Sequence, residues 1–234
     1  MTIVVVFMAG VALVAGWWLS HQRLMAKPWL EEGALGEFSG GQSPSVPRAK
    51  LGLGVFLAVV GSLFALFISA YAMRMELIDW RPLPVPKLLW FNTGVLVLSS
   101  LALHLAVQSA RRDDDAGTLA AVLAADVAAI VFLIGQLLAW RQLVAAGYVV
   151  AANPANSFFY LITATHGLHL LGGLVVLNRT AVRAWTGAAP RELRLSVELC
   201  ATYWHFLLVV WVILLGLLTG WTTDFLAMCS HLLT

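Results

Sequence analysis

Residues 119–141 read LAAVLAADVAAIVFLIGQLLAWR, an apolar run in which Asp126 is the only charged residue before the closing Arg141. The hydrocarbon core of a lipid bilayer is about 30 Å thick, and roughly 20 helical residues cross it. This run is long enough to do so. It predicts a transmembrane helix.

Five more apolar runs of this kind lie near residues 2–20, 51–73, 88–110, 157–178 and 196–222, and charges and prolines fill the breaks between them. The sequence therefore predicts an all-α integral membrane protein, a bundle of six transmembrane helices. Residues 1–50 form an N-terminal helix and a loop, and residues 51–234 form a five-helix core. No basic residue precedes Arg23, so we expect the first run to be a retained helix and not a cleaved signal peptide.

The composition agrees with a membrane protein. Of the 234 residues, 61% are hydrophobic and 11% are charged, and the mean hydropathy is +0.87. A soluble domain has about a quarter of its residues charged. The basic residues are spread over the loops, which speaks against nucleic-acid binding. No phosphate-binding loop, dinucleotide fingerprint or nucleophile elbow occurs, so the sequence offers no catalytic site of its own.

The basic residues predict the orientation. With six spans, the loops at 21–50, 109–118 and 179–194 share one side and hold ten of the 14 Lys and Arg residues. The other side holds four. The positive-inside rule then places the three basic loops in the cytoplasm and both termini on the outer side of a prokaryotic inner membrane.

Polar side chains inside the predicted spans are the candidates for function, because such groups are expensive in lipid. The ionisable ones are His104, Asp126, His166, His169, Glu198 and His205. His166 and His169 share a helix face, as do Glu198 and His205. Axial haem ligation, a metal site and a proton relay are all conceivable for this set. A polar cluster of hydrogen bonds between helices is the interpretation that the residues favour.

Small residues at four-residue spacing predict close helix packing. Gly61, Ala65 and Ser69 form one such row, and Gly216 and Gly220 form another. Rows of this kind let helix backbones approach closely in lipid, within a protein or against a partner.

Four segments, in order, resemble subunit III of the haem-copper terminal oxidases. Residues 159–173, with His166-Gly167-Leu168-His169, resemble the penultimate helix of that subunit, and the run from Glu198 to Trp211, with Tyr203-Trp204-His205-Phe206, resembles its last helix. The other two matches are Trp80, Pro82, Pro84, Asn92-Thr93 and Ser99-Ser100, followed by Gln136 with Trp140. The resemblance covers residues from about 50 to 225.

The sequence departs from the family pattern at three positions. Val60, Ala139 and Leu208 stand where members of the family usually carry carboxylates. Removing buried charges relieves their desolvation, provided that their partners are also removed or satisfied. The departures put in doubt any role in proton handling that rests on those carboxylates.

The resemblance implies a non-catalytic core subunit of an aerobic respiratory terminal oxidase. Haem and copper would belong to partner subunits, and this chain would hold no haem or metal. It would pack against the catalytic subunit I, beside subunit II, and join a proton-pumping complex that could belong to a larger respiratory supercomplex. It would hold structural phospholipid, with Arg183 at a basic family position that contacts a lipid headgroup, and it would support proton uptake and sustained turnover. His166, His169, Glu198 and His205 would form its interhelix polar cluster.

Three other functions stay open at this point. The chain could be the corresponding subunit of a quinol oxidase or nitric-oxide reductase. From another class, a b-type cytochrome electron carrier would use the histidines as haem ligands. A transporter is disfavoured, because no internal repeat with broken mid-span helices is visible.

Overall fold

The structure is a computed structural model, which describes residues 48–187 and 190–220. Five long helices account for most of these residues: α2 (Arg48–Met75), α3 (Leu88–Arg111), α4 (Asp115–Ala145), α5 (Pro154–Trp185) and α6 (Pro190–Leu218). A single 3-10 turn, η2 (Val150–Ala152), precedes α5. All five helices are long and apolar enough to cross a membrane. The five predicted spans from residue 51 onward are therefore confirmed, and the sixth, residues 2–20, lies outside the described residues.

The helices are longer than the apolar runs that predicted them. α5 has 32 residues, which at 1.5 Å per residue gives a length of about 48 Å. This exceeds the roughly 30 Å of a hydrocarbon core. The end turns of the helix therefore reach the headgroup region, where polar side chains can meet water.

Local capping groups set where the helices begin and end. The Asp114 carboxylate accepts a hydrogen bond from the Gly117 backbone N–H at 2.9 Å, and this bond starts α4. Asn153 caps α5 in the same way, with Pro154 in the first turn. Both patterns satisfy N–H groups that a helix start leaves unpaired. At the end of α3, Arg194 of α6 donates from Nε to the Ala110 carbonyl at 2.8 Å.

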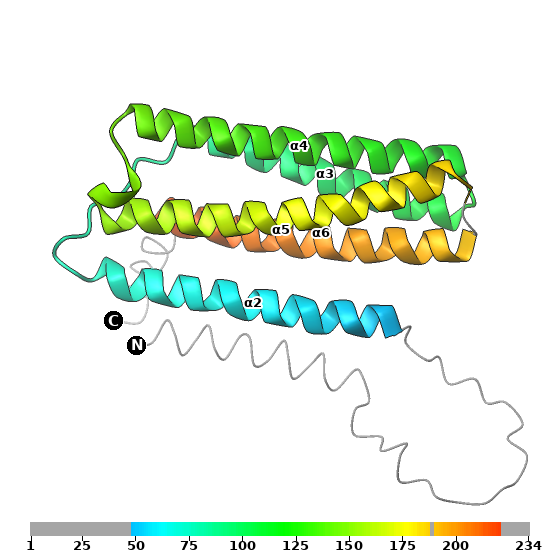
Figure 1. Cartoon of the computed structure of the whole chain (residues 1–234), viewed down its shortest axis with the longest axis horizontal. Helices are drawn as coiled ribbons and strands as arrows, with labels where there is room; N and C mark the ends of the chain where they lie inside the picture. Colours follow the sequence, from blue (N-terminus) through cyan, green and yellow to red (C-terminus); the bar gives the residue numbers. More distant parts are fainter. Residues whose placement is uncertain (1–47, 188–189, 221–234) are drawn as a thin grey trace, which may run out of the picture. The chain divides into compact units, whose positions relative to one another are not determined.

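The five helices pack in layers (Figure 1). α3 lies beside α4, α5 lies beside α6, and α2 packs against α5 and α6. α3 also contacts α6, and α4 contacts α5, so these four helices surround a common core. α2 buries the smallest share of its apolar length and is the peripheral helix of the described set.

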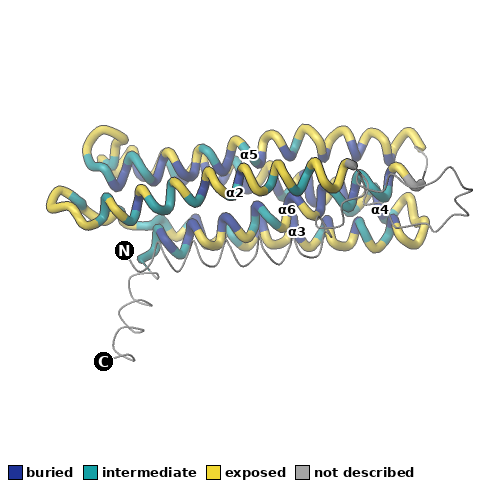
Figure 2. The backbone as a smooth tube through the Cα atoms, turned by 90° about the horizontal axis from the view of Figure 1, so that it is seen from below, coloured by how far each residue is buried: buried dark blue, intermediate teal, exposed yellow. Residues whose placement is uncertain are grey.

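Large aromatic side chains fill the core. Trp204 and Trp211 of α6, Phe132 of α4 and Phe159 of α5 are all fully buried. The outward surfaces carry exposed aliphatic side chains along most of each helix, so buried and exposed residues alternate along the backbone (Figure 2). This distribution is what a bundle needs if its outer surface is to face lipid.

Two glycines that lie outside the predicted small-residue rows, Gly135 and Gly173, permit neighbouring helices to approach closely. A Cβ at Gly135 would clash with the Asn92 side chain, where α4 meets α3. A Cβ at Gly173 would lie 2.6 Å from Tyr203 Cε1 and 2.7 Å from Trp204 Cζ3, where α5 meets α6. Of the predicted small residues, Gly61 faces Phe206 at ordinary contact distance, whereas a Cβ at Gly216 would meet nothing within 4 Å in the described part of the chain.

We predict that Gly173→Ala destabilises the bundle and that Gly172→Ala, one residue earlier on α5, does not. A Cβ at Gly172 would meet nothing within 4 Å, whereas at Gly173 it would push into two rigid aromatic rings. Overpacking of this kind costs about 1–3 kcal/mol. Thermal unfolding of the two purified variants in detergent measures the difference. Equal unfolding temperatures for the two variants would show that the α5–α6 contact is not as tight as the structure has it.

Candidate functional site

Three tryptophans and their hydroxyl partners form a seam of hydrogen bonds between helices in the core. The Trp204 indole N–H of α6 donates to Ser99 Oγ of α3 at 2.9 Å, and the Ser99 hydroxyl donates to the Ala125 carbonyl of α4 at 2.8 Å. One serine thus joins three helices. Since Trp204 and Ser99 are both fully buried, neither group could find water instead.

Two more tryptophans make the same type of contact. Trp211 donates its indole N–H to Thr93 Oγ1 at 2.9 Å, which joins α6 to α3. Trp140 donates to Thr163 Oγ1 at 3.1 Å, which joins α4 to α5. Trp204, Trp211, Thr93, Ser99 and Trp140 all lie in the segments that resemble the oxidase family. In this chain their side chains hold helices together.

His166 is enclosed in the core. Its Nε2–H donates to the Leu207 carbonyl of α6 at 3.1 Å. The rings of Phe64, Phe132 and Trp211 surround the imidazole at centroid distances of 4.9–6.3 Å. With no exposed surface, His166 joins α5 to α6 and cannot reach a cofactor outside the bundle.

The other two predicted histidines bond to their own helices. His169 Nδ1–H donates to the Thr165 carbonyl at 2.8 Å, and His205 Nδ1–H donates to the Ala201 carbonyl. His205 is exposed on α6, where its ring lies beside that of His104 on α3. Because each donates from Nδ1, the Nε2 atom of each ring is an acceptor.

Glu198 lies at the edge of the bundle and pairs with two cations. Lys50 Nζ of α2 lies 2.8 Å from its carboxylate, and Arg111 Nη2 of α3 lies 3.2 Å from it. These ion pairs link α6 to α2 and to α3. The four residues predicted as one cluster therefore make separate contacts: no hydrogen bond joins His166, His169, Glu198 and His205 to one another within the described part of the chain.

Asp126 has a partner that the sequence did not indicate. Asn178 of α5 donates from Nδ2 to Asp126 Oδ1 of α4 at 3.0 Å. The carboxyl group is buried and the Asn178 side chain is exposed. The contact is an interhelix hydrogen bond between α4 and α5. Asn178 is a polar residue seven positions before the end of α5. Its presence within a span is the feature of the sequence that could have indicated a partner for Asp126.

Arg183 lies near the end of α5 with its side chain exposed. It donates from Nη1 to Ser196 Oγ of α6 over 3.4 Å, a long and weak bond. Arg179 lies one turn earlier on α5 and is also exposed. The guanidinium of Arg183 keeps donors available beside the α5–α6 junction.

The three apolar residues singled out in the sequence, Val60, Ala139 and Leu208, pack among hydrophobic side chains. Val60 is buried against Phe64, Ile162 and Val210. Ala139 is fully buried, and Leu208 packs against the main core. The valine side chain at position 60 fits these hydrophobic neighbours.

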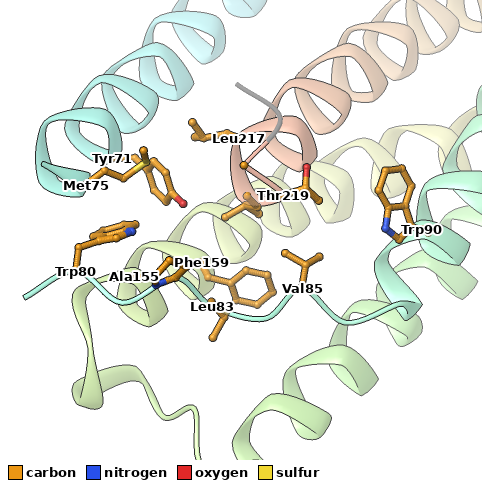
Figure 3. A pocket seen from close by; sticks show the side chains of 13 residues that line it. Tyr71, Met75, Trp80, Leu83, Val85, Trp90, Ala155, Phe159, Leu217 and Thr219 are labelled. Carbon is orange, nitrogen blue, oxygen red and sulfur yellow. The ribbon is translucent and has the colours of Figure 1, made fainter. Parts of the chain in front are cut away.

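A cavity of about 460 Å³ lies at the end of the bundle where α2 ends and α5 begins (Figure 3). Its walls are mainly apolar and aromatic, with Tyr71, Trp80, Trp90, Phe159 and Leu217 among them. Ala155 also lines it, 28 residues before Arg183 on the same helix, which corresponds to about 42 Å. The cavity and Arg183 therefore lie at opposite ends of the bundle.

An ion pair fixes the connection after α2 at that same end. Arg74 donates to both carboxylate oxygens of Asp79, with Nη1 at 2.6 Å from Oδ1. These hydrogen bonds hold the pKa of the Asp79 carboxyl below its ordinary value. The pair therefore contributes stability above the ordinary pKa of an aspartate, and the contribution is lost as the pH falls through the lowered pKa.

The described residues contain no group of three or more His, Cys, Asp or Glu side chains that could hold a metal ion. The side chains of the seam are already committed to hydrogen bonds between helices, and the rest are spread over separate contacts. Together, the seam and these separate contacts hold the five helices at fixed positions relative to one another.

Known proteins with similar sequences give the arrangement a family. The sequence model of a family described as "Cytochrome c oxidase subunit III" matches residues 19–223. A "Probable cytochrome c oxidase subunit 3" of Mycobacterium tuberculosis is 32% identical over 165 residues, which cover 68% of this chain and 78% of that protein. The "Cytochrome c oxidase subunit 3" of a Synechocystis species is 30% identical over 169 residues, covering 70% of this chain and 71% of the relative. That of Yarrowia lipolytica is 28% identical over 189 residues, covering 75% and 69%.

Proposed function

Because the chain belongs to the cytochrome c oxidase subunit III family, we propose that it is a multi-pass membrane subunit that serves its oxidase by packing and not by chemistry of its own. One observation carries the proposal. Three tryptophans of the family-like segments each donate a hydrogen bond to a neighbouring helix, and Ser99 extends one of these bonds from Trp204 to the Ala125 carbonyl. The seam holds α3, α4, α5 and α6 in a fixed arrangement. A catalytic subunit can dock against this fixed bundle.

Haem and copper belong, in this proposal, to partner subunits of the subunit I and subunit II type. The enclosure of His166 supports this, since its ring has no exposed surface.

Co-purification tests the proposed function. The tagged chain, extracted in mild detergent, should bring down chains that mass spectrometry identifies as subunits I and II, and the complex should consume oxygen with reduced cytochrome c. The isolated subunit should show no Soret band. A Soret band in the isolated subunit would indicate a b-type cytochrome, and activity with quinol or nitric oxide in place of cytochrome c would indicate the alternative oxidoreductases.

We propose further that Arg183 holds the headgroup of a structural phospholipid. An arginine keeps its charge at the membrane interface and can form two parallel hydrogen bonds with a phosphate. Arg183 is exposed, and the one hydrogen bond that its guanidinium makes within the described residues, to Ser196, is long. The lipid tails would run beside α5 and α6, away from the cavity at the other end.

Arg183→Ala should reduce the phospholipid that stays bound through purification, whereas Arg179→Ala should not. Both arginines are exposed on the last turns of α5, so the pair separates a specific site from general attraction to headgroups. Native mass spectrometry of the purified complexes counts the retained lipids. Equal lipid content in wild type and Arg183→Ala would reject the site.

The end of the bundle that carries Arg183 also bears on the orientation of the protein in the membrane. We propose that the end with Lys50, Arg111 and Arg183 faces the cytoplasm of a prokaryotic cell, because positively charged loops are retained there. A cysteine introduced at Arg112, which is exposed between α3 and α4, should react with a membrane-impermeant thiol reagent in inverted vesicles and not in spheroplasts. The opposite labelling would reverse the assignment.

The proposed support of proton uptake and turnover is indirect. Two carboxylates inside the described spans have partners that account for them: Asp126 accepts from Asn178, and Glu198 pairs with Lys50 and Arg111. Three further positions, Val60, Ala139 and Leu208, carry no acid. If acids at those positions serve proton delivery elsewhere in the family, this oxidase would obtain that function from its catalytic subunit alone.

We predict that Asp126→Asn and Glu198→Gln leave turnover and proton pumping nearly unchanged. The asparagine still offers an oxygen to Asn178, and the glutamine loses partly exposed ion pairs worth about 0.2–1 kcal/mol each. Oxygen consumption and proton release in proteoliposomes measure both quantities. A large fall in protons pumped per electron, in a complex that keeps all its subunits, would show that these carboxylates carry protons.

A further inference from the structure

The exposed polar side chains of the spans are concentrated on one side of the bundle. α3 presents the exposed His104, Gln108 and Arg111 at the spacing of successive turns, and α6 presents the half-buried Glu198 and the exposed Thr202 and His205 at the same spacing. We call these six residues, with Lys50 beside Glu198, the α3–α6 face. The outward surface of the α4–α5 pair differs. Its exposed side chains within the spans are mostly aliphatic, such as Val127 and Leu168, and Asn178 there is already bonded to Asp126.

The two rows are in register. α3 and α6 run in opposite directions, Arg111 bonds to Glu198 at 3.2 Å, and the rings of His104 and His205 lie 6.2 Å apart. Each histidine is seven residues from the charged residue of its row, a distance of about 10 Å along the helix. The face therefore has a charged edge and, about 10 Å deeper, a pair of imidazoles.

The imidazoles lack partners for part of their hydrogen-bonding capacity. His205 donates from Nδ1 to its own helix, which leaves Nε2 as an acceptor. His104 makes the ring contact with His205 and no hydrogen bond with the residues that the structure describes. In hydrocarbon an unpaired polar group is strongly unfavourable. Ionisable side chains within spans accordingly face protein or water.

Neither lipid tails nor the first predicted span of the chain can supply these partners well. Acyl chains have no hydrogen-bonding groups. Between Thr2 and Ser20 the only hydrogen-bonding side chains are those of Trp17 and Trp18, close to one end of the span. The edge of the face also carries one net positive charge, because Lys50 and Arg111 share a single carboxylate.

From this complementarity we propose that the α3–α6 face is the surface on which a transmembrane helix of another oxidase subunit docks. That helix carries a hydroxyl or N–H donor level with His104 and His205. About seven residues toward the charged edge it carries a carboxylate. This inference rests on the proposed function, because it takes the partner from the oxidase complex.

Site-specific photocrosslinking in the assembled complex tests the face. A benzophenone side chain replaces Leu101 of α3 or Val209 of α6, each one turn from a histidine of the face, so that both histidines are kept. The matched controls replace Val127 of α4 and Leu168 of α5. All four side chains are 54–67% exposed, so the probes differ in the face they report and not in accessibility.

Probes at Leu101 and Val209 should crosslink to another subunit of the oxidase, in a membrane-spanning peptide with the stated donor and carboxylate, and the controls should give lipid adducts. Crosslinks to lipid alone, to residues 1–47 of the same chain or to a second copy would overturn the proposal. Crosslinks to an oxidase subunit from the controls instead would overturn the face and leave the proposed function intact. Failure to co-purify with any oxidase subunit would overturn both.

A second measurement tests the imidazoles themselves. His104→Leu combined with His205→Leu removes both groups from an exposed surface and leaves the core unchanged. Each lost interhelix hydrogen bond should raise the dissociation of this subunit in detergent about threefold. Val127→Thr, a change of similar size on the α4–α5 surface, should have no effect. Equal dissociation of the histidine variant and wild type would overturn the assigned contact.

Discussion

The contact on which the rest of the bundle depends is the hydrogen-bonded chain from Trp204 through Ser99 to the Ala125 carbonyl. In a membrane the hydrophobic effect does not drive helices together, because lipid is as apolar as their side chains. Helix packing must then come from close contact and from polar groups that have no other partner. The buried indole of Trp204 finds Ser99 of α3, and the serine finds the backbone of α4. The depth and rotation of three helices are set together, and the glycine contacts at Gly135 and Gly173 follow from that register.

Other polar residues of the bundle also take hydrogen-bond or ion-pair partners from the protein. His166 keeps its position in the core because the Leu207 carbonyl accepts its proton and three aromatic rings fill the space around it. His169 and Thr165 bond along their own helix. Glu198 lies where two cations and the headgroup region are in reach. Val60 and Ala139 are both buried in hydrophobic clusters.

The outer surface of the bundle is not uniform. The surface of α4 and α5 is aliphatic and suits lipid, whereas α3 and α6 present histidines and an ion cluster on one face. A subunit that works by packing needs one surface that differs from the rest, because a single polar face gives the subunit a defined orientation toward its partner. The internal seam and the external face share α3 and α6, so two of the helices that the seam joins also present the polar face.

The sequence alone was sufficient for the class of protein, the number of described spans and the family, because each depends on local composition or on motifs in order. It underestimated the helix lengths. Residues 157–178 predicted α5, which covers Pro154–Trp185, since hydropathy reports the apolar centre and capping groups decide the ends. It also named the important polar residues, among them His166, Glu198 and Asp126. Their partners were decided only by the tertiary structure: the Leu207 carbonyl, Lys50 with Arg111, and Asn178. The spacing within one helix fixes which residues share a face. The rotation and depth of the neighbouring helix, which bring groups distant in the sequence to hydrogen-bonding distance, result from the packing of the whole bundle.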